Sequence, residues 1–247
     1  MKNFIGSMLA LLILSFAIPA TAQQMTWTTK SKEAKDIALN GAHHMMNAEF
    51  AQAYDDFMTS VKLDPDFTVP LVFLANLTTG DTRKSYAAKA LSSAANKTEG
   101  EKLFASIVDS TLTREQRQEV WNKLHSMFPD GAMLGHFYVV TRPTADERLA
   151  AAQEYIKKFP DEAGMYNTIA YFYMQDKKDN TMAKQYLDKY LAMYPDGCNP
   201  YDSMGEYYLN VGDNDNSEKY YKLALEKYPF NISSLEALEK IEAAKKK

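Results

Sequence analysis

The sequence contains little cysteine, glycine or proline, and it has no excess of positive charge. A single cysteine among 247 residues cannot form an internal disulfide, a cysteine-rich zinc site or a redox pair. The formal net charge is −4, from 28 basic and 32 acidic residues, so nucleic acid is not favoured as a partner. Glycine (10) and proline (9) are scarce for this length, which favours helices. With 46% hydrophobic residues, the sequence is neither disordered nor collagen-like.

Residues 1–22 have the pattern of a cleavable signal peptide. Lys2 supplies a positive start, residues 4–18 are apolar, and Ala20-Thr21-Ala22 matches a small-residue cleavage site. The apolar stretch is short for a membrane span, and no cysteine follows it to carry a lipid anchor. We therefore predict a periplasmic or secreted chain that has no membrane span once the signal is removed. An uncleaved signal anchor is the alternative.

A pair of one large and one small residue recurs about every 30 to 35 positions. In the clearest unit, Tyr201 to Tyr208, large residues and one glycine stand at positions i, i+3, i+4 and i+7, which lie on one face of a helix. The small residue lets a second helix pack closely, and a proline after that helix ends it. The pairs are Asn40-Gly41, Leu74-Ala75, Phe104-Ala105, Leu134-Gly135, Ile169-Ala170 and Met204-Gly205, and units close at Pro65, Pro129, Pro160, Pro195 and Pro229.

This pattern resembles the tetratricopeptide repeat (TPR) family, whose unit is a helix–turn–helix of about 34 residues. The resemblance implies an all-α, right-handed α-solenoid of about six TPR-like units over residues 31–232, after an N-terminal extension at 23–30. The middle units, residues 68–130, match the pattern poorly. A C-terminal capping helix is predicted at 233–247, since the last repeat of a solenoid needs a polar outer face.

Four segments have the form of a capping box, in which a Ser or Thr and a Glu or Gln three residues later close the start of a helix. They begin at Thr98, Thr113, Thr144 and Ser233. The segment 212–216, Gly-Asp-Asn-Asp-Asn, is expected to form a turn between paired helices. A calcium loop is disfavoured there because the central glycine of an EF-hand is missing.

No motif predicts catalysis, a cofactor or a metal ion, so the chain is expected not to be an enzyme. His43 and His44 are adjacent and cannot chelate as an i, i+4 pair does on a helix. Asp55 and Asp56 are expected to face solvent. Cys198 stands just before a helix, a position that lowers the pKa of a thiol, although an incidental cysteine is favoured over a reactive one.

The resemblance implies that an extended peptide lies in the concave groove, along the stripe beside the core stripe of each first helix. The carboxylate-clamp subgroup of TPR proteins uses Lys, Arg and Asn on this stripe, whereas here only Lys102 is basic, and Asp202 and Glu206 are acidic. A ligand that is partly apolar and partly basic would suit this surface. The predicted groove residues are Lys102, His136, Asn167, Tyr171, Asp202 and Glu206.

These features predict a non-catalytic scaffold of the cell envelope that binds a protein or peptide segment. Two alternatives stay open. One is an enzyme or carbohydrate-handling component built on a helical-repeat scaffold, and the other is a structural spacer in an envelope assembly.

Overall fold

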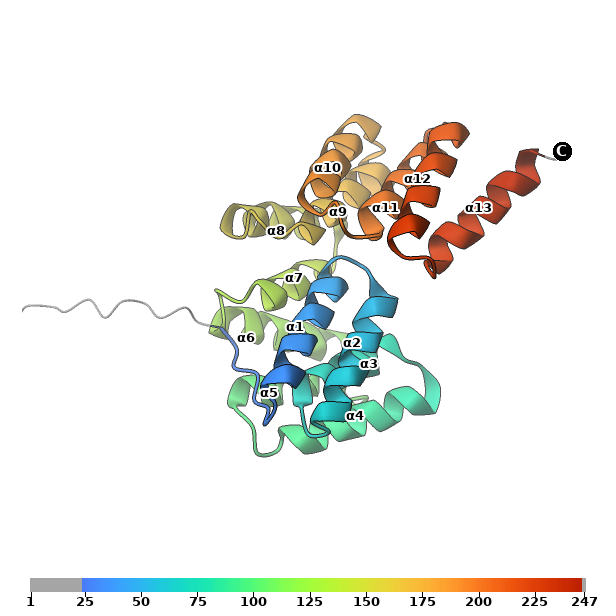
Figure 1. The fold of residues 1–247 in the computed structure, drawn as a ribbon. Coiled ribbons are helices and arrows are strands. Elements are labelled where there is room, and N and C mark those ends of the chain that lie inside the picture. Colours follow the sequence, from blue (N-terminus) through green and yellow to red (C-terminus); the bar gives the residue numbers. More distant parts are fainter. Residues whose placement is uncertain (1–23, 246–247) are drawn as a thin grey trace, which may run out of the picture.

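The computed structural model describes residues 24–245, and its regular structure over that range is helical (Figure 1). The predicted signal peptide, residues 1–22, lies outside the described residues. No helix within residues 24–245 is both long and apolar enough to cross a membrane. The helices are α1 (Lys32–Met46), α2 (Phe50–Leu63), α3 (Thr68–Leu77), α4 (Gly80–Ala94), α5 (Glu99–Ser106), α6 (Arg114–Met127), α7 (Ala132–Val140), α8 (Ala145–Lys158), α9 (Gly164–Tyr171), the π-helix η1 (Phe172–Lys177), α10 (Asn180–Met193), α11 (Asn199–Asn210), α12 (Asn214–Lys227) and α13 (Ile232–Lys245).

Successive helices pack as pairs, with η1 extending α9. The pairs are α1/α2, α3/α4, α5/α6, α7/α8, α9/α10 and α11/α12, and α13 packs on the last of them. The all-α helical-repeat architecture is therefore confirmed, with six helix pairs and a terminal helix over the described residues.

The small residue of each repeat allows the two helices of a pair to approach closely. A Cβ atom added at Gly205 would lie 2.8 Å from the ring of Tyr221 on the partner helix. One added at Gly41 would lie 2.8 Å from the ring of Phe57. These distances are shorter than van der Waals contact, so a glycine at this position is a packing requirement of the pair.

Three of the four capping boxes are confirmed, and one is wrong. The Thr98, Thr113 and Thr144 side chains each accept a hydrogen bond from the backbone N–H three residues later, and the Glu or Gln there completes the box. At the fourth position α13 has already begun at Ile232, and the Asn231 side chain accepts from the Ser234 N–H instead. The hydroxyl of Ser233 donates to Asp202 and is not a cap.

The predicted turn between the paired helices is present but shorter than residues 212–216, because α12 already begins at Asn214. Gly212 adopts a left-handed backbone, with φ of +84°, and the Asp213 carboxylate accepts from the N–H of Asn216 at the start of α12. Residues 24–245 contain no group of three or more His, Cys, Asp and Glu side chains that could hold a metal ion.

The front half of the molecule, α1–α7, has one continuous core. Phe57 stacks on Phe73 with ring centroids 4.7 Å apart, and Phe73 meets Phe104 at 5.6 Å. The segment before α1 belongs to this core, because Trp27 is 8% exposed and contacts Phe67. The back half, α8–α13, has several smaller clusters.

The two halves also meet away from their covalent connection. The corner between α1 and α2 reaches the start of α9, the helix α10 and the start of α11 (Figure 1). A Cβ atom added at Gly164, at the start of α9, would lie 2.0 Å from the carbonyl oxygen of Met46 at the end of α1. The array therefore has a contact between distant repeats, which an open solenoid with nearest-neighbour contacts lacks.

Candidate functional site

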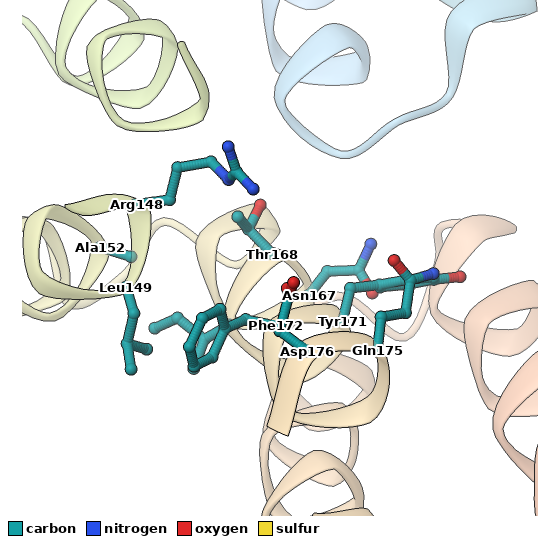
Figure 2. A pocket seen from close by; sticks show the side chains of 10 residues that line it. Arg148, Leu149, Ala152, Asn167, Thr168, Tyr171, Phe172, Gln175 and Asp176 are labelled. Atoms are coloured by element: carbon teal, nitrogen blue, oxygen red, sulfur yellow. The ribbon is translucent and has the colours of Figure 1, made fainter. Parts of the chain in front are cut away.

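The first part of the site is a pocket of about 280 Å³ between α8 and α9–η1, here called the Asn167 pocket (Figure 2). Arg148 and Leu149 of α8 form one wall, and Asn167, Tyr171 and Phe172 form the other. The helix changes from α to π geometry within this second wall, at Phe172.

Asn167 is the unusual residue of this pocket. It is only 9% exposed, and its side-chain oxygen is buried without a hydrogen-bond partner. Most buried polar atoms in proteins are paired, because burying an unpaired one costs about 1–3 kcal/mol. A donor from a bound ligand would remove this cost once a rotation of the Asn167 side chain turned the buried oxygen toward the pocket.

Tyr171 connects the Asn167 pocket to a second one of about 460 Å³, here called the Glu206 pocket. Its hydroxyl donates to the Glu206 carboxylate over 2.6 Å. Burial, together with the neighbouring Glu206 carboxylate, holds the pKa of Tyr171 well above its usual value, so the hydroxyl stays a donor. The pair therefore fixes one carboxylate at the floor of the Glu206 pocket.

Asp202 lies one helical turn away on α11 and faces α13. Its carboxylate accepts from Ser233 over 3.1 Å and from Ser234 over 2.5 Å. Burial raises the pKa of Asp202, and the two hydroxyls act in the opposite direction. Asp202 is only 6% exposed, and both of its side-chain hydrogen bonds above are to α13.

The Glu206 pocket has exposed apolar side chains at its edge. Phe230, between α12 and α13, is 72% exposed, and Ile232, the first residue of α13, is 69% exposed. Phe50 at the start of α2 is 54% exposed. Exposed apolar side chains around an acidic floor are suited to a partner that offers both apolar and basic groups.

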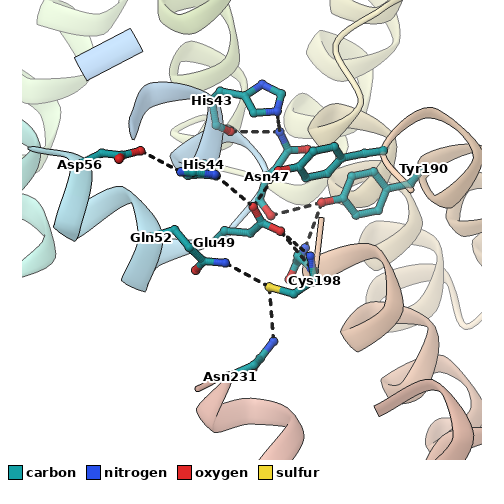
Figure 3. A network of polar contacts seen from close by, with 11 residues as sticks. His43, His44, Asn47, Glu49, Gln52, Asp56, Tyr190, Cys198 and Asn231 are labelled. Carbon is teal, nitrogen blue, oxygen red and sulfur yellow. Dashed lines mark hydrogen bonds and ion pairs between the residues drawn. The ribbon is translucent and has the colours of Figure 1, made fainter. Parts of the chain in front are cut away.

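A carboxylate of the front half also lies against this pocket (Figure 3). Glu49, at the α1–α2 corner, accepts from the backbone N–H of Cys198 at 2.7 Å and of Asn199 at 3.2 Å, at the N-terminus of α11. The Tyr194 hydroxyl donates to the same carboxylate over 2.8 Å. We call this contact the Glu49 junction. The N-terminal end of a helix favours negative charge, so the junction stabilises the packing of the α1–α2 corner against α11.

The backbone beside Glu49 is held in a rare conformation. Ala48 has φ of +58°, in the left-handed region that residues other than glycine seldom adopt. The Tyr190 hydroxyl donates to the carbonyl oxygen of the preceding Asn47 over 3.2 Å. Contacts from the back half thus surround a corner that would be unfavourable on its own.

The structure agrees with the favoured expectation of an unreactive Cys198 and corrects the expectation for Asp56. Cys198 is 4% exposed, and burial together with the Glu49 carboxylate raises the pKa of its thiol to about 12. Its thiolate is therefore disfavoured despite its position before α11. Asp56 does not simply face solvent, because its carboxylate meets the His44 ring nitrogen Nδ1 at 3.0 Å, whereas Asp55 is exposed.

The six predicted groove residues divide between the two halves. Asn167, Tyr171, Asp202 and Glu206 line the two connected pockets of the back half. His136 is buried in α7, where desolvation lowers its pKa to about 4 and keeps the ring neutral. Lys102 is exposed on α5 in the front half. The structure therefore does not bring these last two residues to the pockets.

The sequence patterns gave no indication of Glu49 or Gly164. Glu49 is bonded to residues 145 to 150 positions away, and no local spacing records such a contact. Gly164 lies outside the recurring large–small pairs. A glycine at the start of a helix without a repeat role was the one local signal of a close backbone approach.

No protein-family model matches the sequence, and no curated protein does. Solved structures share its fold, among them the following two. A chain of the APC/C hetero-tetramer Cut9-Hcn1 aligns with a TM-score of 0.52 and 16% identity, over 85% of this chain and 42% of that one. A tetratricopeptide repeat protein from Parabacteroides merdae aligns with a TM-score of 0.51 and 14% identity, over 86% of this chain and 100% of that one. The chain thus has the fold of TPR proteins, and it spans less than half of the Cut9-Hcn1 chain it matches.

Proposed function

We propose that this protein is a non-catalytic scaffold that binds a segment of a partner protein across the Asn167 and Glu206 pockets. The observation that carries the proposal is the buried, unpartnered side-chain oxygen of Asn167 beside the Tyr171–Glu206 pair. An amide oxygen in this position accepts a hydrogen bond from an extended peptide backbone. The TPR-like fold supports a role in protein interaction in general.

The charge and shape of the pockets select the kind of segment. Glu206 and Asp202 place negative charge on the floor of the Glu206 pocket, and Phe230 and Ile232 offer apolar surface at its edge. A segment with one basic and one large apolar side chain fits both features. The rigid helix pairs present these groups without a large ordering cost on binding.

The proposed location is the periplasm or the exterior of the cell. Its support is the signal-peptide pattern of residues 1–22 in the sequence. Mass spectrometry of the protein purified from its native source tests this directly. A native N-terminus at Gln23 is expected, and an intact Met1 would contradict export by cleavage.

Selection of random peptides displayed on phage, with the purified mature protein as bait, tests the binding proposal. We expect enrichment of segments that combine Lys or Arg with an aromatic or aliphatic residue. The strongest peptide is then synthesised, and its affinity is measured by fluorescence anisotropy. Asn167→Ala and Glu206→Gln should each weaken binding about tenfold, the effect of one hydrogen bond to a buried or charged group.

The matched control is Asn214→Ala, which removes an exposed asparagine on the outer helix α12. It should leave the affinity unchanged. Equal affinity of Asn167→Ala and the control would contradict the placement of the site. Turnover of an envelope substrate that a single side-chain change abolishes would contradict the non-catalytic role.

A further inference from the structure

All five arginines of the chain gather at one surface, here called the arginine surface. It consists of two adjoining pockets of about 440 and 310 Å³, which share Arg117, Trp121 and Thr141. No lysine, aspartate or glutamate lines either pocket, although lysines greatly outnumber arginines in the sequence. The five residues are Arg83, Arg114, Arg117, Arg142 and Arg148.

The charge of these arginines is not neutralised by ion pairs. Within residues 24–245, the side-chain ion pairs involve lysines and His44, and none involves an arginine. Three carboxylates lie near this surface without forming an ion pair with it. Asp109 interacts electrostatically with Arg117, Glu115 with Arg114 and Glu147 with Arg142, so five arginines face three carboxylates. The surface is therefore positive in a chain whose net charge is negative.

Neutral acceptors hold several of the guanidinium groups in place. Arg83 donates to the carbonyl oxygen of Ala75 over 2.7 Å, and Arg117 donates to that of Ile107 over 3.2 Å. Arg142 donates to the Tyr138 carbonyl oxygen and lies 3.7 Å from the centre of the Tyr138 ring. These contacts orient the side chains but leave donors for an anion, and the planar fork of arginine matches a carboxylate.

The larger pocket adds an apolar cavity directly beside the positive charge. Phe73, Phe104, Trp121 and Phe137 line it, together with Met45. Trp121 also lines the smaller pocket, where Arg114 and Arg142 lie. A ligand that fits both features has an aromatic side chain and one or more carboxylates a few ångströms from it.

We propose that the arginine surface binds an acidic peptide segment that carries an aromatic side chain between carboxylates. The aromatic ring enters the pocket of Phe73 and Trp121, and the flanking carboxylates meet Arg114 and Arg117. The arginines stand on α4, α6, α8 and the α7–α8 turn, not on the first helices that carry the predicted groove. This site adjoins the Asn167 pocket through Arg148, is distinct from the acidic Glu206 pocket, and takes a ligand of opposite charge to the one proposed there.

The test uses Trp121 as the reporter. The chain has two tryptophans, so Trp27→Phe leaves Trp121 as the only one. The probe is a short synthetic peptide of alternating aspartate and phenylalanine, blocked at both ends. We expect a saturable change in Trp121 emission, and a much weaker response to peptides in which asparagine replaces aspartate or alanine replaces phenylalanine. Calorimetry with the unsubstituted protein gives the same affinity without Trp27→Phe.

The deciding variant is Arg114→Gln with Arg117→Gln, since neither residue lines the Asn167 or the Glu206 pocket. Its affinity should fall at least about tenfold, because each arginine–carboxylate pair is a charge-assisted contact. Arg114→Lys with Arg117→Lys keeps the charge but loses the fork, and should give an intermediate loss. The matched control is Lys219→Gln with Lys240→Gln, two exposed lysines of the back half, which should bind as the parent does.

Three results would overturn this proposal. The first is an unchanged affinity of the Arg114→Gln, Arg117→Gln variant that retains the parent's helical circular dichroism. The second is equal binding of the asparagine peptide. The third is binding to vesicles of phosphatidylcholine and phosphatidylglycerol without any response to the acidic peptide, which would assign the surface to lipid.

Discussion

The front and back halves achieve burial in different ways. In the front half, buried residues from Met25 to Leu134 belong to one continuous core. In the back half, four separate clusters of a few buried residues each join neighbouring helices. The front half contains units 68–130, which match the repeat pattern poorly, whereas the back half contains the unit that matches it best. The units that depart from the repeat pattern are therefore helical and well packed, and they share one core with their neighbours.

Aromatic residues explain the difference. Phe73 of α3 contacts Phe57 of α2, Phe104 of α5 and Phe137 of α7, so one side chain joins four repeats. In the back half, aromatic contacts such as Tyr208 with Tyr220 stay within one helix pair. Where a side chain of a repeat packs against several other repeats, its residue type is set by those contacts and departs from the type that the repeat pattern has at that position.

The largest expected effect is a separation of the two halves on unfolding. Both tryptophans lie in the front half, so their fluorescence reports that half, whereas circular dichroism reports all helices. Phe104→Ala should cost about 3–5 kcal/mol and move the fluorescence transition in urea. Leu187→Ala, in a small cluster of the back half, should move the early part of the circular dichroism transition instead. If both variants shift both signals equally, the halves form one cooperative unit and the comparison fails.

The next effect is a pH dependence at the end of the front half. Burial lowers the pKa of His136 to about 4, while an unfolded histidine titrates near 6.5. Between these values the unfolded chain binds the additional proton, so stability is lost as the pH falls from about 6.5 to about 4, by up to about 3 kcal/mol. Urea unfolding at pH 7 and pH 4.5 measures it. His136→Phe should remove this component, and an unchanged difference between the two pH values in that variant would contradict it.

A third test addresses the helix crossing in the back half. Gly205→Leu should cost about 1–3 kcal/mol, because any Cβ there meets the Tyr221 ring. Thermal unfolding followed by circular dichroism measures the loss. The tryptophan signal of the front half should stay in place. Unchanged thermal stability would show that the assigned repeat phase is wrong.

The smallest expected effect concerns the contact between the halves. Glu49→Gln keeps an acceptor for the N-terminus of α11 but removes its charge, which should cost about 1 kcal/mol. Amide hydrogen exchange measured by mass spectrometry should show faster exchange at residues 47–52 and 194–199. Glu33→Gln, at an exposed position of α1, is the control. Equal exchange in both variants would show that the Glu49 junction does not stabilise the contact between the two halves.

Local spacing predicted most of the fold, because helix pairing depends on residues close in sequence. The small residue within a pair and the Thr caps are such signals, and they placed six pairs correctly. Glu49 and Gly164 could not be predicted in this way, since their partners lie in other repeats. The position of Asp202 was assigned from helix phase alone, which does not reveal that Ser233 and Ser234 of α13 occupy its carboxylate.

The Glu49 junction also determines the order in which the molecule assembles. During synthesis Glu49 is added to the chain long before its partners, which are 145 to 150 residues further on. The entropy lost in closing a loop grows with its length, and contacts of large sequence separation form slowly. The front core requires nothing beyond α7, so it can form while the back repeats are still emerging. Closure at Glu49 is expected only after α11 has formed, and until it occurs the N-terminus of α11 lacks the Glu49 carboxylate.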